Sequence, residues 1–214
     1  MRVFSTIIQR LLIFTLAGCF LLGCIATTPA VSTRFYVLTP VDPAAPSMRE
    51  PDQAFPLSIQ IAALRLPQYL EKPQIVTRSG SNQLELAEYH QWGGNLRKNM
   101  IHVLAQNFSQ LLATADICMA PFQPASPPVF IIELEVMQFE ADAGGKARLW
   151  AQWRLFRGTD KKNLTTRITR LVSAVGTLDY EHRVSAMSGL LAQLSRIIGQ
   201  EILIHVSQNP GSMK

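Results

Sequence analysis

Two consecutive segments, VFIIELEVMQFE at residues 129–140 and KARLWAQWRLF at residues 146–156, decide the fold that the sequence predicts. Each segment alternates apolar with polar residues over much of its length, which is typical of a strand with one buried face. The five residues between them, ADAGG, end in two glycines. A two-residue hairpin turn of the primed type requires positive φ at both of its positions. We therefore expect a β-hairpin that turns at Gly144 and Gly145.

This turn determines which residues face each other across the hairpin. The expected pairs are Leu134–Leu155 and Val136–Trp153 on one face, and Glu135–Arg154 and Phe139–Trp150 on the other. The first face is apolar, so we expect it to pack on helices. The second face combines an ion pair with aromatic rings, including Phe156, and such cross-strand pairs stabilise a sheet by about 0.2–1 kcal/mol each. If helices cover one face only, these aromatic rings are exposed and mark an interface.

Two segments, one before and one after the hairpin, have the period of amphipathic helices. One apolar stripe runs from Leu96 to Leu112 after Asn95, a residue type favoured as an N-cap, and another runs from Tyr180 to Val206 after Asp179. Further strands are expected at Phe35–Leu38, Leu57–Leu64, Gln74–Arg78, Gln83–Ala87 and Leu164–Thr177. The sequence therefore predicts an α/β protein of the α+β kind, a two-layer sandwich whose mostly antiparallel sheet carries both amphipathic helices on one face.

Composition is consistent with one globular domain. The chain has 214 residues, of which 48% are apolar, and its formal net charge is +5. The charge forms no basic run of the kind that nucleic-acid-binding proteins carry, so we expect no nucleic-acid partner. We expect a single domain over residues 35–207, followed by a disordered tail at 208–214.

The first 30 residues have the pattern of an export signal. Arg2 and Arg10 are the only charged residues before Arg34, and an apolar stretch, LLIFTLAGCFLLGCIA, follows Arg10. The stretch is somewhat shorter than the roughly 20 residues that a membrane-spanning helix needs, which favours a cleaved signal. Small residues precede its two cysteines, as in the bacterial lipobox, where the cysteine is acylated and becomes the new N-terminus. We expect a lipoprotein signal peptide at residues 1–23 and a tether at 24–34.

Either Cys19 or Cys24 fits the lipobox. Acylation at Cys24 gives the longer apolar region and a polar mature start, IATTPAVST, so we favour Cys24. Cys19 remains the alternative, because Ala-Gly before it is the better local pattern. If Cys24 is acylated, Cys118 is the only free thiol. If Cys19 is acylated, Cys24 and Cys118 are both available for a disulfide, which suits an oxidising compartment.

Patterns that carry catalysis are absent from the sequence. It contains no G-x-S-x-G, H-E-x-x-H or C-x-x-C, and its Gly-Gly-Lys lies between two strands and not between a strand and a helix. The four histidines are spread over more than 100 residues. We therefore expect no enzyme, no catalytic residue, no metal site and no cofactor.

Large apolar and aromatic groups gather in segments that are predicted to be loops. They are Tyr69 and Leu70 in LRLPQYLEKPQIV, and Tyr89 and Trp92 in AEYHQWGG. Loops with such groups either close the end of a core or bind a partner.

These segments, in their order, resemble a known family. The most specific part is LRLPQYLEKPQIVTR at residues 64–78 together with EYHQWGGNL at 88–96, and FYVL, the hairpin and the final helix accompany it. The chain is identified over nearly all of residues 20–206 as similar to the ABC-type transport auxiliary lipoproteins of the paraquat-inducible protein C type. Together with Trp150 of the hairpin, the matching positions are our partner-binding candidates: Leu66, Pro67, Tyr69, Leu70, Arg78, Tyr89, His90 and Trp92.

The resemblance implies a non-enzymatic subunit of an intermembrane transport system for lipids or organic solvents. In that family the lipoprotein is held by its acyl chains in the inner leaflet of the Gram-negative outer membrane and faces the periplasm. Its implied partner is an MCE-domain protein that forms the conduit, with an ABC permease and ATPase connected indirectly, and a homo-oligomer is left open. The alternative is a periplasmic lipid-binding carrier lipoprotein whose aromatic residues line an acyl-chain cavity.

Overall fold

The computed structural model describes residues 31–49, 56–122, 124, 127–177 and 179–208. The predicted signal peptide, both candidate lipidation sites and most of the tether and tail lie outside these residues. Within the described part, the residues from Thr33 onward form one compact unit. Its elements are β1 (Arg34–Tyr36), β2 (Ile59–Arg65), the 3-10 helix η1 (Gln68–Glu71), β3 (Gln74–Arg78), β4 (Leu84–Trp92), α2 (Leu96–Leu111), β5 (Ile117–Met119), β6 (Phe130–Asp142), β7 (Lys146–Arg157), β8 (Asn163–Ala174) and α3 (Tyr180–Gln208).

Strand β6 is the centre of the eight-stranded sheet that the described residues form. One side of β6 pairs antiparallel with β7 along most of its length, and β7 pairs antiparallel with β8. The other side of β6 is shared: β2 pairs in parallel with its first half, and β3 pairs in parallel with Ala141 and Asp142 at its end. Beyond these strands, β5 lies beside β2, and β4 and then β1 lie beside β3. Most paired residues lie in antiparallel ladders, while the four ladders of β1–β4, β2–β5, β2–β6 and β3–β6 are parallel.

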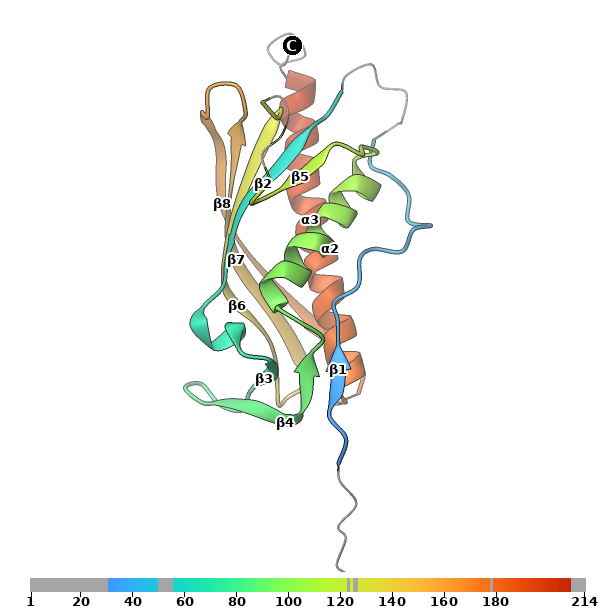
Figure 1. Cartoon of the computed structure of the whole chain (residues 1–214), viewed down its shortest axis with the longest axis vertical. Helices are drawn as coiled ribbons and strands as arrows, with labels where there is room; N and C mark the ends of the chain where they lie inside the picture. Colours follow the sequence, from blue (N-terminus) through green and yellow to red (C-terminus); the bar gives the residue numbers. More distant parts are fainter. Residues whose placement is uncertain (1–30, 50–55, 123, 125–126, 178, 209–214) are drawn as a thin grey trace, which may run out of the picture. The chain divides into compact units, whose positions relative to one another are not determined.

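The two helices form the second layer, as predicted. Both lie on the same face of the sheet and pack against each other (Figure 1). Asn95 caps α2, because its Oδ1 accepts a hydrogen bond from the Lys98 backbone N–H at 3.0 Å. Asp179 does the same for α3 by accepting from the His182 N–H at 2.9 Å. The core between the layers is filled by fully buried side chains, among them Met100, Leu104, Phe108, Phe130, Ile132, Phe139, Trp153, Leu191 and Ile198.

The hairpin of β6 and β7 forms, but its predicted register is wrong. Leu134 pairs with Trp153, Glu133 with Arg154, and Phe139 with Leu149; Ile132 takes the predicted place of Leu134 opposite Leu155. One cause is the loop, which has three residues, Ala143 to Gly145. The backbone N–H of Gly145 donates to the Asp142 carbonyl, and Gly145 alone has the left-handed φ of 77°.

A β-bulge is the second cause. The register shifts between Val136 and Gln138, so Met137 is an extra residue on β6. The extra residue returns Phe139 to the helix-covered face, where it is fully buried. The prediction that Phe139 lies with Trp150 on the exposed face is therefore wrong. Trp150 and Phe156 do lie on the uncovered face, and both are half-buried.

Strand boundaries differ most from the sequence prediction around β4 and β1. Strand β3 has its predicted bounds, whereas β4 extends five residues past the predicted Ala87, to Trp92. The extension has a partner, because His90 to Trp92 pair in parallel with β1. The segment AEYHQW, predicted to be a loop, is consequently a strand. After Tyr36 the chain leaves the sheet, so the predicted strand Phe35–Leu38 is cut short.

The Pro-rich segment after β1 is held on the helices. Asn99 Oδ1 accepts from the Leu38 N–H at 2.7 Å, and Asn107 Oδ1 accepts from the Val41 N–H at 2.8 Å. Asn107 is fully buried, and its Nδ2 donates to Ser195 on α3 at 3.0 Å. The Thr39 N–H donates to Oγ of Ser188 on α3 at 3.1 Å, so backbone N–H groups of this irregular segment are satisfied by side chains of both helices.

Candidate functional site

A buried carboxylate lies at the centre of the most polar cluster in the described structure. Glu140 is 1% exposed, although it belongs to the face of β6 that the helices leave uncovered. The β-bulge at Met137 gives it this orientation. The segment from β2 to β3, with η1 in its middle, covers it. An ionised carboxylate in such a place requires paired charges and hydrogen bonds, because its loss of water is otherwise very costly.

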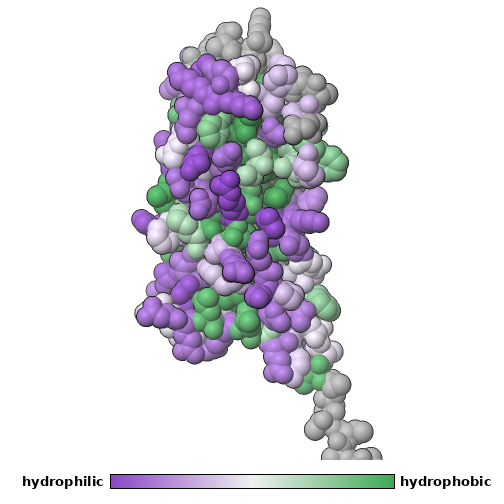
Figure 2. Space-filling view, turned by 60° about the vertical axis from the view of Figure 1, so that its left-hand side comes forward, coloured by the Kyte–Doolittle hydropathy of each residue, from purple (hydrophilic) through white to green (hydrophobic). Residues whose placement is uncertain are grey.

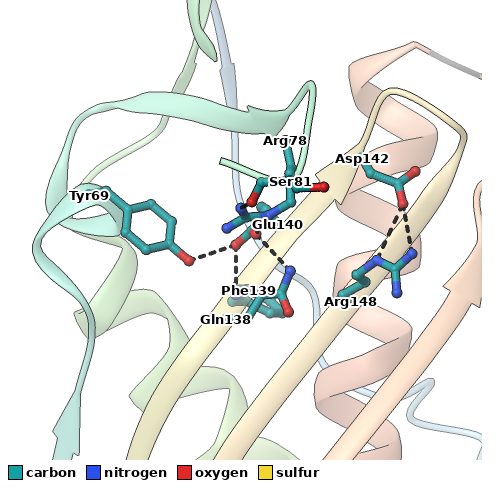
Figure 3. A network of polar contacts seen from close by, with 8 residues as sticks. All are labelled: Tyr69, Arg78, Ser81, Gln138, Phe139, Glu140, Asp142 and Arg148. Atoms are coloured by element: carbon teal, nitrogen blue, oxygen red, sulfur yellow. Dashed lines mark hydrogen bonds and ion pairs between the residues drawn. The ribbon is translucent and has the colours of Figure 1, made fainter. Parts of the chain in front are cut away.

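Four groups surround this carboxylate (Figure 3). The hydroxyl of Tyr69 donates to Oε2 at 2.8 Å, and Nε of Arg78 lies 2.8 Å from Oε1 in an ion pair. Nε2 of Gln138 donates to Oε1 at 2.9 Å, and the backbone N–H of Phe139 to Oε2 at 3.1 Å. Each carboxylate oxygen therefore accepts hydrogen bonds from two donors.

The cluster changes the ionisation of its members. Burial, followed by the charge of Glu140 and the hydrogen bond to it, raises the pKa of Tyr69 well above the usual value. The hydrogen bond to Glu140 raises the pKa of Arg78. Tyr69 therefore remains a neutral hydrogen-bond donor and Arg78 a cation at any physiological pH. This arrangement clamps η1 and β3 to β6.

The residues of LRLPQYLEKPQIVTR have separate places in this arrangement. Tyr69 and Arg78 meet at Glu140, as described above. Leu70 is 2% exposed and belongs to the core, and Leu66 and Pro67 are half-buried. Among the candidates of this run, Tyr69 and Arg78 thus contact Glu140, while Leu70 packs η1 into the core.

The candidates on β4 form a second group. His90 stacks on Tyr180 of α3 with ring centroids 3.9 Å apart, and its Nδ1 is 2.8 Å from the hydroxyl of Tyr36. Burial, with a smaller effect of the charge of Arg34, lowers the pKa of His90. Trp92 is buried in the core, and Tyr89 is exposed. The group joins β1, β4 and α3 through ring contacts.

Trp150 lies beside the Glu140 cluster, at the wall of an open hollow of about 620 Å³. The turn after β3 and the loop between β6 and β7 border this hollow. The guanidinium of Arg170 on β8 lies 4.5 Å from the centre of the Trp150 ring. Figure 2, in which the β8 side comes forward, shows apolar patches separated by polar groups.

An ion pair on the loop side of the hollow is formed by Asp142 and Arg148, at 3.1 Å. Although burial acts to raise it, hydrogen bonds from the Lys146 backbone N–H and from the Arg148 guanidinium lower the pKa of Asp142. The carboxylate is thus ionised at neutral pH, and the pair is a fixed feature of the wall.

Sequence reasoning missed Glu140 and the hollow. Glu140 ends the strand that the sequence predicts, next to an expected turn, where an acidic residue is commonly solvated. The signal that points to it is the pairing of a tyrosine and an arginine within one short run, but their common partner lies more than 60 residues away.

No group of three or more His, Cys, Asp or Glu side chains in the described part of the chain is placed to hold a metal ion. None of the described helices is long and apolar enough to cross a membrane. Cys118 forms no disulfide with another residue that the structure describes.

Comparison with solved structures identifies similar folds. A protein of Xanthomonas campestris is 16% identical, with a TM-score of 0.62 over 84% of this chain and 97% of that protein. An uncharacterised protein is 19% identical, with a TM-score of 0.61 over 74% of this chain and 99% of the other. At these identities the likeness concerns the fold alone. No curated protein is significantly similar to the chain.

Residues 36–199 match the family model of the ABC-type transport auxiliary lipoprotein component. The matched range runs from the end of β1 into α3 and contains both groups of candidate residues. Because the match spans most of the chain, this protein belongs to the family of ABC-type transport auxiliary lipoprotein components.

Proposed function

We propose that this protein is a non-enzymatic, lipid-anchored subunit of an MCE/ABC-type system that carries lipids or organic solvents between the two membranes of a Gram-negative envelope. The single observation that carries the proposal is the family match over residues 36–199. The LAGCFLLGC segment supports the anchor, with acylation at Cys24 and retention in the inner leaflet of the outer membrane. The domain faces the periplasm and contacts the permease and ATPase only through the conduit protein.

The docking partner in this proposal is the MCE-domain protein. Among our candidates, Tyr89 and Trp150 offer the most aromatic surface, since Tyr89 is exposed and one edge of Trp150 lines the open hollow. Leu70 and Trp92 are buried, and we propose that they support docking by holding η1 and β4 in place. Aromatic groups of this kind dominate the energy of many protein interfaces.

Co-purification tests the proposal. The tagged full-length lipoprotein is isolated in mild detergent, after cross-linking, from cells in which the transport genes are intact. We expect the MCE-domain protein to be captured, and Tyr89→Ala or Trp150→Ala to reduce the yield severalfold. Phe122→Ala is the matched control, because Phe122 is an aromatic side chain with 73% exposure in the turn after β5. Absence of any MCE-domain protein from the captured material contradicts the proposal.

The carrier alternative requires an acyl-chain cavity. The space between the sheet and the helices is instead occupied by side chains such as Phe108, Phe130 and Trp153, which are fully buried. The core of the described structure thus gives no support to an enclosed cavity, and we favour the docking subunit.

A further inference from the structure

Strand β8 forms an open edge of the sheet. It pairs with β7 on one side, and no described element lies beyond it on the other side (Figure 1). The strand has twelve residues without proline or lysine, and its ladder with β7 is regular except near its start. Proteins usually protect a sheet edge by keeping it short, bending it with a bulge, or placing proline or lysine on it. An edge of this length without these features is suited to receive a further strand.

The backbone of β8 directs the hydrogen-bonding groups of every second residue away from the sheet. The Val175 N–H donates to the Gly145 carbonyl at 2.8 Å, and the same alignment continues along the ladder as far as Thr165. In an antiparallel pair, only alternate residues of a strand bond to the partner strand. The odd-numbered residues of β8 therefore bond to β7, whereas the N–H and C=O groups of the even-numbered residues from 166 to 174 point outward.

The side chains at this edge define what an added strand must carry. Ile168, Arg170 and Val172 alternate on the uncovered face, since Arg170 is opposite Trp150 in the ladder. Ile168 and Val172 are each 55% exposed. Between them, the Arg170 guanidinium lies 4.5 Å from the centre of the Trp150 ring and has no carboxylate partner among the described residues. A strand with an apolar, an acidic and an apolar side chain at alternate positions complements this row.

The charge around β8 favours an acidic partner over a second copy of the chain. Residues 146–174, the hairpin of β7 and β8, contain eight lysines and arginines but one aspartate, in a chain whose net charge is only +5. Strand β8 itself has no acidic residue. Full antiparallel overlap of two copies places Arg167 of each copy opposite Arg170 of the other. Like charges that are directly opposite destabilise a sheet, so β8 repels its own copy.

A membrane surface matches this edge less well than a strand does. Arg167 lies on the helix-covered side, where it pairs with Glu201 of α3 at 3.0 Å, whereas Arg170 lies on the uncovered side. The two charges therefore do not share one face that a lipid surface could meet. An added strand has side chains on both faces, and its backbone pairs with the outward groups of β8.

We infer that β8 is a docking edge for an extended segment of a protein partner, a segment that alternates apolar with acidic side chains on one face. The segment extends the sheet by one strand and bonds to the even-numbered residues of β8. One of its acidic side chains lies opposite Arg170, between apolar side chains at Ile168 and Val172. The inference goes beyond the proposed function and does not depend on it, because it uses neither the family match nor the lipid anchor.

The backbone N–H signals of β8 give a direct readout. The probe is the nonapeptide ETVTETVTE, blocked at both ends, whose central glutamate and two valines match Arg170, Ile168 and Val172. In a ¹H–¹⁵N titration of the full-length protein in detergent micelles, we expect the signals of the even-numbered residues from 168 to 172 to move downfield and their N–H groups to become protected from hydrogen exchange. The odd-numbered N–H groups between them already bond to β7 and should change little. This alternation distinguishes strand addition from binding elsewhere on the surface.

A change in the probe tests the backbone contacts without altering the protein. Methylation of the nitrogen of the central glutamate removes the donor that faces β8 and leaves every side chain in place. We expect the methylated peptide to bind at least about tenfold more weakly than the unmodified one.

A charge exchange tests the acidic contact. We expect Arg170→Glu to weaken binding of the peptide about tenfold, because an opposite-charge pair becomes a like-charge pair. A peptide with lysine in place of the central glutamate should bind Arg170→Glu more tightly than the wild type. Arg196→Glu is the matched control: Arg196 is exposed on α3, the net charge changes equally, and we expect less than about a twofold effect. The N–H spectrum of each variant without peptide shows that it is folded.

Other outcomes overturn the inference. Signals that move without the alternation of even and odd residues, or not at all at about 5 mM peptide, reject the docking edge. Equal effects of Arg170→Glu and Arg196→Glu reject the acidic contact. Protection of the even-numbered N–H groups that rises with protein concentration before peptide is added shows a second copy on the edge, and protection by phosphatidylglycerol vesicles alone shows a membrane contact. Capture of the MCE-domain protein is measured independently, so a failed titration with intact capture rejects this edge and leaves the proposed function standing.

Discussion

Glu140 is the residue that holds η1 and β3 against β6. Its carboxylate is almost fully buried and receives the Tyr69 hydroxyl and the Arg78 guanidinium, both at 2.8 Å. Removing the charge leaves the partly exposed Arg78 guanidinium without its carboxylate partner, so we expect Glu140→Gln to lower the free energy of unfolding by about 2 kcal/mol. Tyr69→Phe removes one hydrogen bond to a charged group, and we expect a loss of about 1.5–3 kcal/mol. Urea denaturation of the purified protein measures both values.

A double-mutant cycle tests whether the two side chains act through each other. In a chain that already carries Glu140→Gln, Tyr69→Phe should cost clearly less than in the wild type, because its charged acceptor is gone. Tyr89→Phe is the control, since Tyr89 is exposed and its hydroxyl should contribute within about 0.5 kcal/mol. Additive effects of the first two substitutions would show that the contact stabilises nothing.

The raised pKa of Tyr69 makes part of the stability depend on alkaline pH. In the unfolded chain the hydroxyl ionises near its usual pKa of about 10, whereas burial and Glu140 keep it protonated in the folded protein. Above pH 10 the unfolded state therefore binds fewer protons, and stability falls as pH rises. We expect the stability advantage of the wild type over Tyr69→Phe to be full at pH 8 and to shrink at pH 11. A constant difference between the two proteins over this range contradicts the assignment.

The sequence predicted the members of this cluster unevenly, for a physical reason. Tyr69 stands out as an aromatic residue in an expected loop, and Arg78 as a position that matches the family run. Glu140 did not, because its burial results from a bulge and from a segment far away in the chain. Local patterns contain no information on either. The same holds for the hollow beside Trp150, which exists only once the turn after β3 and the β6–β7 loop lie side by side.

The loop of the β6–β7 hairpin is the element whose backbone sets the register. Gly145 has φ 77°, a conformation that side chains disfavour, so we expect Gly145→Ala to destabilise the protein by about 1–2 kcal/mol. Gly189 is the matched control, because substituting it by alanine should have the opposite effect on stability. It is exposed on α3, a Cβ there meets nothing within 4 Å, and Gly189→Ala should stabilise the protein by about 0.5–1 kcal/mol. Thermal unfolding of the two variants should shift in opposite directions, and a common direction contradicts this account.

Features that depend on residues close together in the sequence were predicted well. The N-caps Asn95 and Asp179, the two apolar stripes and the alternation of the hairpin depend on neighbouring residues, and each is confirmed. The hairpin register failed because one extra loop residue and one bulge residue each move the pairing. A run with polar residues at its end, such as Val136–Glu140, does not reveal where its alternation breaks.

At the scale of the whole molecule, the layers follow from the sequence and the strand order does not. Two amphipathic helices and several half-apolar strands require a sandwich, because each has one face to bury. The parallel contacts of β2 and β3 with β6 join segments about 70 residues apart, and nothing within either segment specifies them. The same is true of β1, which lies next to β4 although more than 50 residues separate them.

The membrane attachment of the whole molecule depends in our proposal on one cysteine. Cys24 gives a polar mature start, whereas acylation at Cys19 would leave FLLGCIA beside the lipid. We expect Cys24→Ser to move the protein from the membrane to the soluble fraction of the envelope, and Cys19→Ser to leave it in the membrane. The mass of the N-terminal peptide should correspond to acylated Cys24 followed by IATTPAVST. An acylated peptide that begins at Cys19, or membrane retention of the Cys24→Ser variant, shows instead that the first lipobox is used and that the tether is five residues longer.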